Sequence, residues 1–135
     1  MSQHKIDAFT LAYIEAMLWA SSDESDESGG EPLDKNYSID DIAESAMIKI
    51  VADCKRFQEE NAEDIATIPS QVYNGEEWQG ESLAGHDLFL TRNGHGVGFW
   101  DRDYLSEEVS DRLTVASKAF GEVYPYVGDD GLIYC

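Results

Sequence analysis

The sequence predicts an α+β fold in which about three helices pack with a small antiparallel β-sheet of two hairpins, in the chain order ααββαββ. Two observations support this prediction. Apolar residues recur at helical spacing in three segments, 7–20, 38–60 and 106–120. Turn residues at 93–94 (Asn-Gly) and 128–131 (Gly-Asp-Asp-Gly) separate short runs of apolar and aromatic residues, a pattern typical of hairpins.

The first helix is expected from Asp7 to Ala20, with Asp7 as its N-cap. Apolar residues cover so much of this segment that we expect it to be buried on several sides. It is too short to span a bilayer. The residues that follow, at about 21–37, are acidic and rich in Ser and Gly, so they predict a flexible acidic loop.

The second helix is expected to begin after Ser38 and to end near Glu60. Ser38 and Asp41 have the spacing of a capping box, and the pattern allows a break near Ala43–Glu44. Breakers between residues 66 and 85 predict irregular structure there.

The C-terminal half has the features of two hairpins around a helix. His86–Arg92 and Val97–Asp101 are expected to pair as strands across the Asn-Gly turn. The helix at 106–120 should stop at Gly121, and residues 123–127 and 132–134 should form the second hairpin.

The charge of the chain is strongly negative. Its 135 residues include 28 Asp+Glu and 9 Lys+Arg, a formal net charge of −19, while 42% hydrophobic residues indicate a folded chain. We expect one domain over residues 1–135. Such a surface repels nucleic acid and anionic membranes and attracts basic protein surfaces. The residues expected to bind a partner are the acidic groups Asp23, Glu24, Asp26, Glu27, Glu31, Glu59, Glu60, Glu63 and Asp64.

Two cysteines, Cys54 and Cys135, do not form a disulfide framework, so we expect both to be reduced and the protein to be intracellular. No signal-peptide pattern is present at the N-terminus.

A second hypothesis concerns chemistry. A carboxylate and imidazole group could bind a divalent metal, and the candidates are His86, Asp87, Asp101 and Asp103. Their spacing matches no metal motif, and the favoured interpretation is that Asp101 and Asp103 cap a loop, pair with Arg92, Arg102 or Arg112, or do both. No nucleophile stands beside a base, so neither catalysis nor a cofactor is expected.

Three stretches of the sequence resemble a family of small acidic, mostly uncharacterised proteins encoded by bacteriophages and prophages. They are residues 23–38, Ala52-Asp-Cys54 with Phe57-Gln, and Gly85-His-Asp-Leu-Phe-Leu-Thr-Arg-Asn-Gly-His-Gly-Val-Gly-Phe-Trp-Asp-Arg102. The resemblance implies an accessory protein in the cytoplasm of an infected bacterium. It implies no catalytic or metal-binding residue.

The favoured hypothesis is a non-enzymatic phage protein that binds a basic host protein, such as a nuclease or a restriction or CRISPR defence complex, and mimics DNA. A metal-assisted hydrolase or binding module that uses His86 and Asp101 is one alternative. A structural or assembly protein joined through Phe99 and Trp100 is the other.

Overall fold

Helices α1 (Ala8–Ala20) and α4 (Gly80–Arg92) pack against each other in the computed structural model, which describes residues 6–23, 31–94 and 97–135. Asp7 caps α1 as predicted, since its carboxylate accepts a hydrogen bond from the Thr10 amide at 2.8 Å. Eight of the 13 residues of α1 are buried, which confirms the expected burial on several sides.

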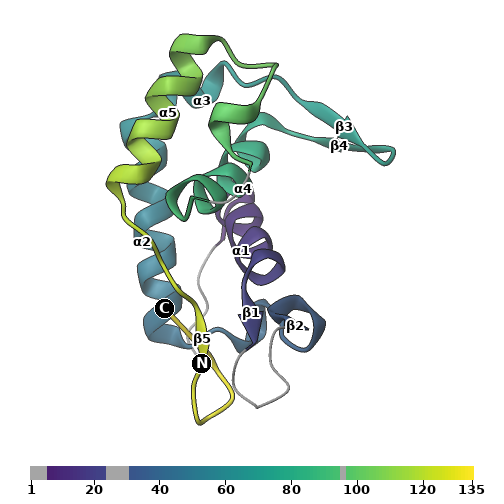
Figure 1. Cartoon of the computed structure of the whole chain (residues 1–135), viewed down its shortest axis with the longest axis vertical. Coiled ribbons are helices and arrows are strands. Elements are labelled where there is room, and N and C mark those ends of the chain that lie inside the picture. The colour runs from purple at the N-terminus through teal and green to yellow at the C-terminus, as the bar shows by residue number, and fades with distance from the viewer. Residues whose placement is uncertain (1–5, 24–30, 95–96) are drawn as a thin grey trace.

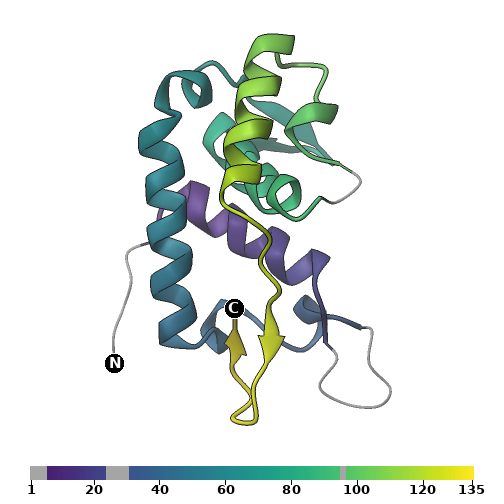
Figure 2. The same ribbon diagram turned by 60° about the vertical axis from the view of Figure 1, so that its left-hand side comes forward.

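The second predicted helix is confirmed as α2 (Glu44–Glu60). A short 3-10 turn, Ile39–Asp41, precedes it and carries the expected capping box between Ser38 and Asp41. One face of α2 is buried, with Phe57 among its core residues. Helix α3 (Ala62–Ala66) follows directly after Asn61, and Figure 2 shows α2 running along one side of the molecule.

Helix α5 (Glu107–Ala119) confirms the third helical segment. The Ser106 hydroxyl caps it by accepting a hydrogen bond from the Val109 amide at 3.2 Å. It stops where predicted, at Gly121, whose φ of 78° suits glycine.

The described strands form three separate antiparallel pairs, not one shared sheet. The pairs are β1 (Ser22–Asp23) with β2 (Glu31–Pro32), β3 (Gln71–Tyr73) with β4 (Glu76–Trp78), and β5 (Tyr126–Val127) with β6 (Ile133–Tyr134). The last pair confirms the C-terminal hairpin. It lies against the start of α2, where the Ala43 amide donates to the Ile133 carbonyl at 2.8 Å. The β3–β4 hairpin projects away from the helices (Figure 1).

The hairpin predicted from His86–Arg92 and Val97–Asp101 is wrong. The first segment is the second half of α4, and Phe99–Asp101 is a 3-10 turn. Asn93 and Gly94 do end an element of secondary structure, but that element is helix α4 and not a strand. Gly94 has a φ of 67°. Mixed helices and antiparallel strands are therefore confirmed, whereas the order ααββαββ is not.

The segment expected to be irregular, 66–85, contains β3, β4 and the first turns of α4. The loop expected at about 21–37 has ordered flanks, because β1 pairs with β2 and Leu33 is fully buried. Residues 24–30 lie outside the described residues.

The core joins the helices through aromatic rings. Phe57 contacts Phe9 at 5.9 Å between ring centroids and Phe99 at 6.0 Å, while Tyr13 meets Phe89 edge-on at 5.4 Å. Phe99 is buried and Trp100 is 49% exposed, and both lie in a 3-10 turn instead of the hairpin expected for them. None of the described helices has the length and apolar character needed to cross a membrane.

Candidate functional site

The first group of predicted partner-binding residues lies around β1 and β2. Asp23 and Glu31 face each other in the backbone register of this pair. Glu24, Asp26 and Glu27 fall outside the described residues. The structure therefore brings the two ends of this acidic segment together.

The second group lies where α2 ends and α3 begins. Glu59 and Glu63 are exposed, and among the described residues neither side chain forms an ion pair or a side-chain hydrogen bond. Glu60 lies 3.6 Å from Arg56, and both side chains are more than half exposed. These carboxylates remain accessible to a partner.

Asp64, also predicted to bind a partner, takes part in an ion pair within the fold. Arg112 donates two hydrogen bonds of 2.8 Å to its carboxylate and thereby ties α5 to α3. These bonds from Arg112 lower the pKa of Asp64 below its ordinary value. Asp64 is therefore a structural residue as well as an acidic one.

Every arginine of the chain has a carboxylate partner within the protein. The pairs are Arg56–Glu60, Arg92–Asp53, Arg102–Asp87 and Arg112–Asp64. The carboxylates outside these pairs have only the chain's five lysines to balance them. The arginines therefore reinforce the fold and do little to relieve the acidity of the remaining surface.

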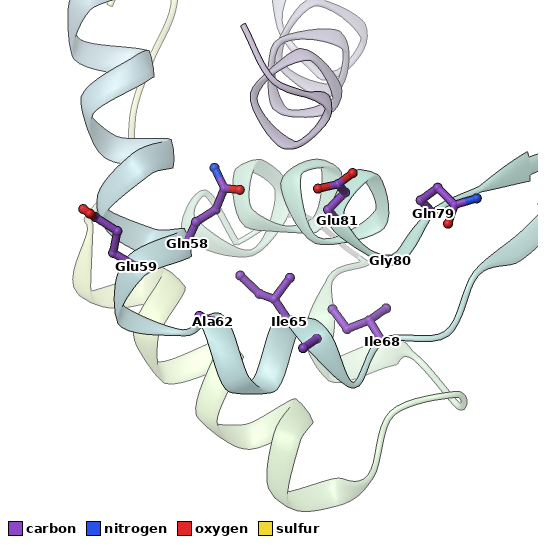
Figure 3. A pocket seen from close by; sticks show the side chains of 9 residues that line it. Gln58, Glu59, Ala62, Ile65, Ile68, Gln79, Gly80 and Glu81 are labelled. Atoms are coloured by element: carbon purple, nitrogen blue, oxygen red, sulfur yellow. The ribbon is translucent and has the colours of Figure 1, made fainter.

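A hollow of about 570 Å³ lies beside these carboxylates, between the end of α2, α3 and the start of α4 (Figure 3). We call it the α2–α4 groove. Ile65 and Ile68 point from α3 and the segment after it toward α4. The full lining is Gln58, Glu59, Ala62, Ile65, Ala66, Ile68, Gln79, Gly80 and Glu81.

Small residues leave the groove open. Ala62 and Ala66 are four residues apart on α3, so they share one face of the helix, and both are exposed. At Gly80 a β-carbon would lie 2.3 Å from the Ile68 carbonyl oxygen, so only glycine lets α4 begin this close to Ile68. The result is an apolar floor that no described large side chain covers.

The rim of the groove is acidic. Glu59 from α2 and Glu81 from α4 are both exposed, and the lining contains neither Lys nor Arg. Gln58 is fixed by hydrogen bonds from its Nε2 to Asp7 Oδ2 at 3.1 Å and to the Cys54 carbonyl at 3.3 Å. The groove thus combines an apolar floor with a lining whose charged residues are all acidic.

The candidate metal residues lie elsewhere, around the middle of α4. Asp87 is 2% exposed, and Arg102 donates to both of its oxygens, from Nε to Oδ2 at 2.8 Å and from Nη2 to Oδ1 at 2.6 Å. His86 Nδ1 lies 3.4 Å from Asp87 Oδ1. Asp101 and Asp103 are exposed. In the described part of the chain, no three His, Cys, Asp or Glu side chains gather as a metal site requires.

Opposing effects set the pKa of Asp87. Burial alone would raise it, but hydrogen bonds from Arg102 and His86, with their charges, outweigh burial and lower it. Asp87 is therefore an ionised carboxylate paired with Arg102, whereas the sequence predicts arginine pairing or loop capping at Asp101 and Asp103.

A second, smaller hollow of about 250 Å³ opens beside this pair. Its lining is Tyr73, Trp78, Leu83, His86, Asp87 and Arg102. The His86 ring contacts two tryptophans, with centroid distances of 6.4 Å to Trp19 and 6.2 Å to Trp78. Sequence reasoning missed this cluster because its members come from α1, the β3–β4 hairpin and α4, and no local pattern joins them.

Comparisons with protein-family models, curated proteins and solved structures gave no match to this chain.

Proposed function

We propose that this chain is a non-enzymatic accessory protein of a bacteriophage or prophage that binds a basic surface of a host protein in the bacterial cytoplasm. The observation that carries the proposal is the α2–α4 groove, whose lining contains Glu59 and Glu81 but neither Lys nor Arg, with Glu63 exposed nearby on α3. The favoured target is a protein that handles nucleic acid, such as a nuclease or a defence complex.

Electrostatics supports this class of partner. Helical backbones hold these carboxylates at fixed positions, and an ordered array of carboxylates can replace the phosphates that such proteins bind. The net charge of −19 speeds the approach of a cationic surface and disfavours nucleic acid itself.

The test is a pull-down from bacterial lysate with identification of the captured proteins. The parent should retain a basic protein at about 0.1 M salt and release it at about 0.5 M, because screening lengths shorten from about 10 Å to less than half of that. A variant with Glu59, Glu63 and Glu81 changed to Gln should retain much less. Recovery of only neutral or acidic partners, or retention that salt does not affect, would overturn the proposal.

A further inference from the structure

We infer that the α2–α4 groove receives an amphipathic segment of the basic partner, with apolar side chains on the groove floor and Lys or Arg at the rim. This inference rests on the proposed function and adds the shape and chemistry of the occupant. It also requires two properties of the occupant that charge alone would not: an apolar face, and a fixed spacing between that face and the cationic side chains.

The floor of the groove is built to contact apolar side chains. Ala62 and Ala66 lie about 6 Å apart along the helix axis, given a rise of about 1.5 Å per residue. Ile65 and Ile68 form the walls beside them. A hollow of about 570 Å³ has room for more than one aliphatic side chain, so a helical segment with apolar residues one turn apart matches its length.

Charge at the rim selects a cationic segment over a neutral one. Glu59 and Glu81 stand on different helices, and no lysine or arginine belongs to the lining. The arginine nearest in sequence to Glu59, Arg56, is already paired with Glu60. Lys or Arg side chains that flank the apolar face would be attracted to these exposed carboxylates, an interaction that a neutral segment lacks.

The groove is held in shape before any partner arrives. Hydrogen bonds fix Gln58 to Asp7 and to the Cys54 carbonyl, and the Asp64–Arg112 pair holds α3 against α5. The backbone contact of Gly80 with Ile68 sets the position of α4. A preformed groove avoids the entropic cost of ordering its walls on binding.

The test uses two synthetic peptides of about 12 residues with identical lysines. One carries two leucines at i and i+4, and the other has serine in their place. Binding is measured by fluorescence anisotropy. We expect the leucine peptide to bind about tenfold more tightly, because each leucine buries apolar surface in the groove.

Variants locate the binding. Ala66→Phe fills the groove floor and should reduce the leucine peptide to the affinity of the serine peptide. Ala119→Phe is the matched control, because Ala119 is also an exposed alanine at the last position of a helix, α5, and should change neither affinity. Ala62→Phe gives a second way to fill the floor if Ala66→Phe fails to fold, as judged by circular dichroism.

Other outcomes would overturn the inference. Both peptides could bind equally, in a salt-sensitive way that Ala66→Phe does not change. This result would leave the proposed function intact but would exclude the groove as the binding site. If neither peptide binds, the groove is also excluded as the binding site, and the lysate experiment would still decide the proposed function. If the protein is a dimer by light scattering and Ala66→Phe makes it monomeric without affecting peptide binding, a second copy covers the groove instead.

Discussion

Arg102 and Asp87 form an ion pair with two parallel hydrogen bonds, 2.8 Å from Nε to Oδ2 and 2.6 Å from Nη2 to Oδ1. The Asp87 side chain is 3% exposed and that of Arg102 is 21% exposed. The pair fastens the segment after the Phe99–Asp101 turn to α4 and forms one wall of the hollow beside His86. Arg102 directly follows Val97–Asp101, the segment that the sequence predicts to pair as a strand with His86–Arg92.

Arg102→Gln should destabilise the fold by about 3 kcal/mol, because it leaves a buried carboxylate without its cation. The measurement is urea unfolding at neutral pH. Arg112→Gln is the matched control: it breaks a pair of the same geometry whose arginine is largely exposed, and it should lower the free energy of unfolding much less than Arg102→Gln does. Equal effects of the two substitutions would contradict this explanation of the pair.

The pH dependence of that loss follows from the lowered pKa of Asp87. A carboxyl whose folded-state pKa lies below its ordinary value of 3.8 contributes stability above that pH and loses it as pH falls through the folded-state pKa. In Arg102→Gln the buried carboxylate lacks its main stabilising charge, so protonation relieves it. The difference in unfolding free energy between parent and variant should therefore shrink as the pH is lowered from about 7 to about 3. A difference that stays constant or grows would show that Asp87 is not the group concerned.

Three helices could be predicted because each combines a stripe of apolar residues with signals at its ends. Asp7 and Gly121 act at the predicted ends of α1 and α5, while Ser38 caps the 3-10 turn that precedes α2. Helix α4 lacked such a stripe. Its residues 87–92 are all buried, polar and apolar alike, so the sequence shows no alternation between a buried apolar face and an exposed polar face. The following Asn-Gly pair suits a hairpin turn and a helix end equally well, and only packing against α1 decides between them.

The acidic character of the candidate site was predictable from composition, but the groove was not. Its floor depends on two exposed alanines that leave space and on Gly80, which lets α4 begin close to Ile68, and such small residues give no periodic signal. Asp64 was predicted as a partner-binding residue because it lies in an acidic run. Its ion pair with Arg112, 48 residues away in the sequence, could not be read from local spacing.

Gly85→Ala should disrupt the contact between α1 and α4. A β-carbon at Gly85 would lie 2.0 Å from the Phe9 carbonyl oxygen, so the two helices would have to separate. We expect a loss of about 3 kcal/mol in the free energy of unfolding, although alanine favours a helix over glycine by about 1 kcal/mol. Thermal or urea unfolding measures the effect.

Gly94→Ala, just after the end of the same helix, is the control for a glycine-to-alanine change at a site without a close contact. Nothing lies within 4 Å of a β-carbon there, so the cost is limited to the strain of its φ of 67°, about 1 kcal/mol. A Gly85→Ala protein as stable as the parent would show that the helices cross less closely than described.

Arg92→Lys should be far more damaging than a conservative exchange suggests. The buried guanidinium donates to four acceptors at once: the Gly121 carbonyl at 2.7 Å, the Phe120 carbonyl at 2.9 Å, the Tyr13 hydroxyl at 3.0 Å and Asp53 Oδ2 at 3.1 Å. A single ammonium cannot reach groups spread around a planar fork, so several buried acceptors would lose their donor.

We expect this substitution to cost about 3 kcal/mol in the free energy of unfolding. Arg56→Lys provides the control, because Arg56 is 59% exposed, lies 3.6 Å from Glu60 and stacks over Phe120, and it should cost less than about 1 kcal/mol. The end of α5 should report the difference directly, since Arg92 binds the carbonyls of Phe120 and Gly121 there. Amide hydrogen exchange over residues 115–121 should therefore accelerate in Arg92→Lys relative to exchange over α2. Uniform acceleration across both helices would mean that Arg92 acts on the core as a whole and does not specifically hold the end of α5.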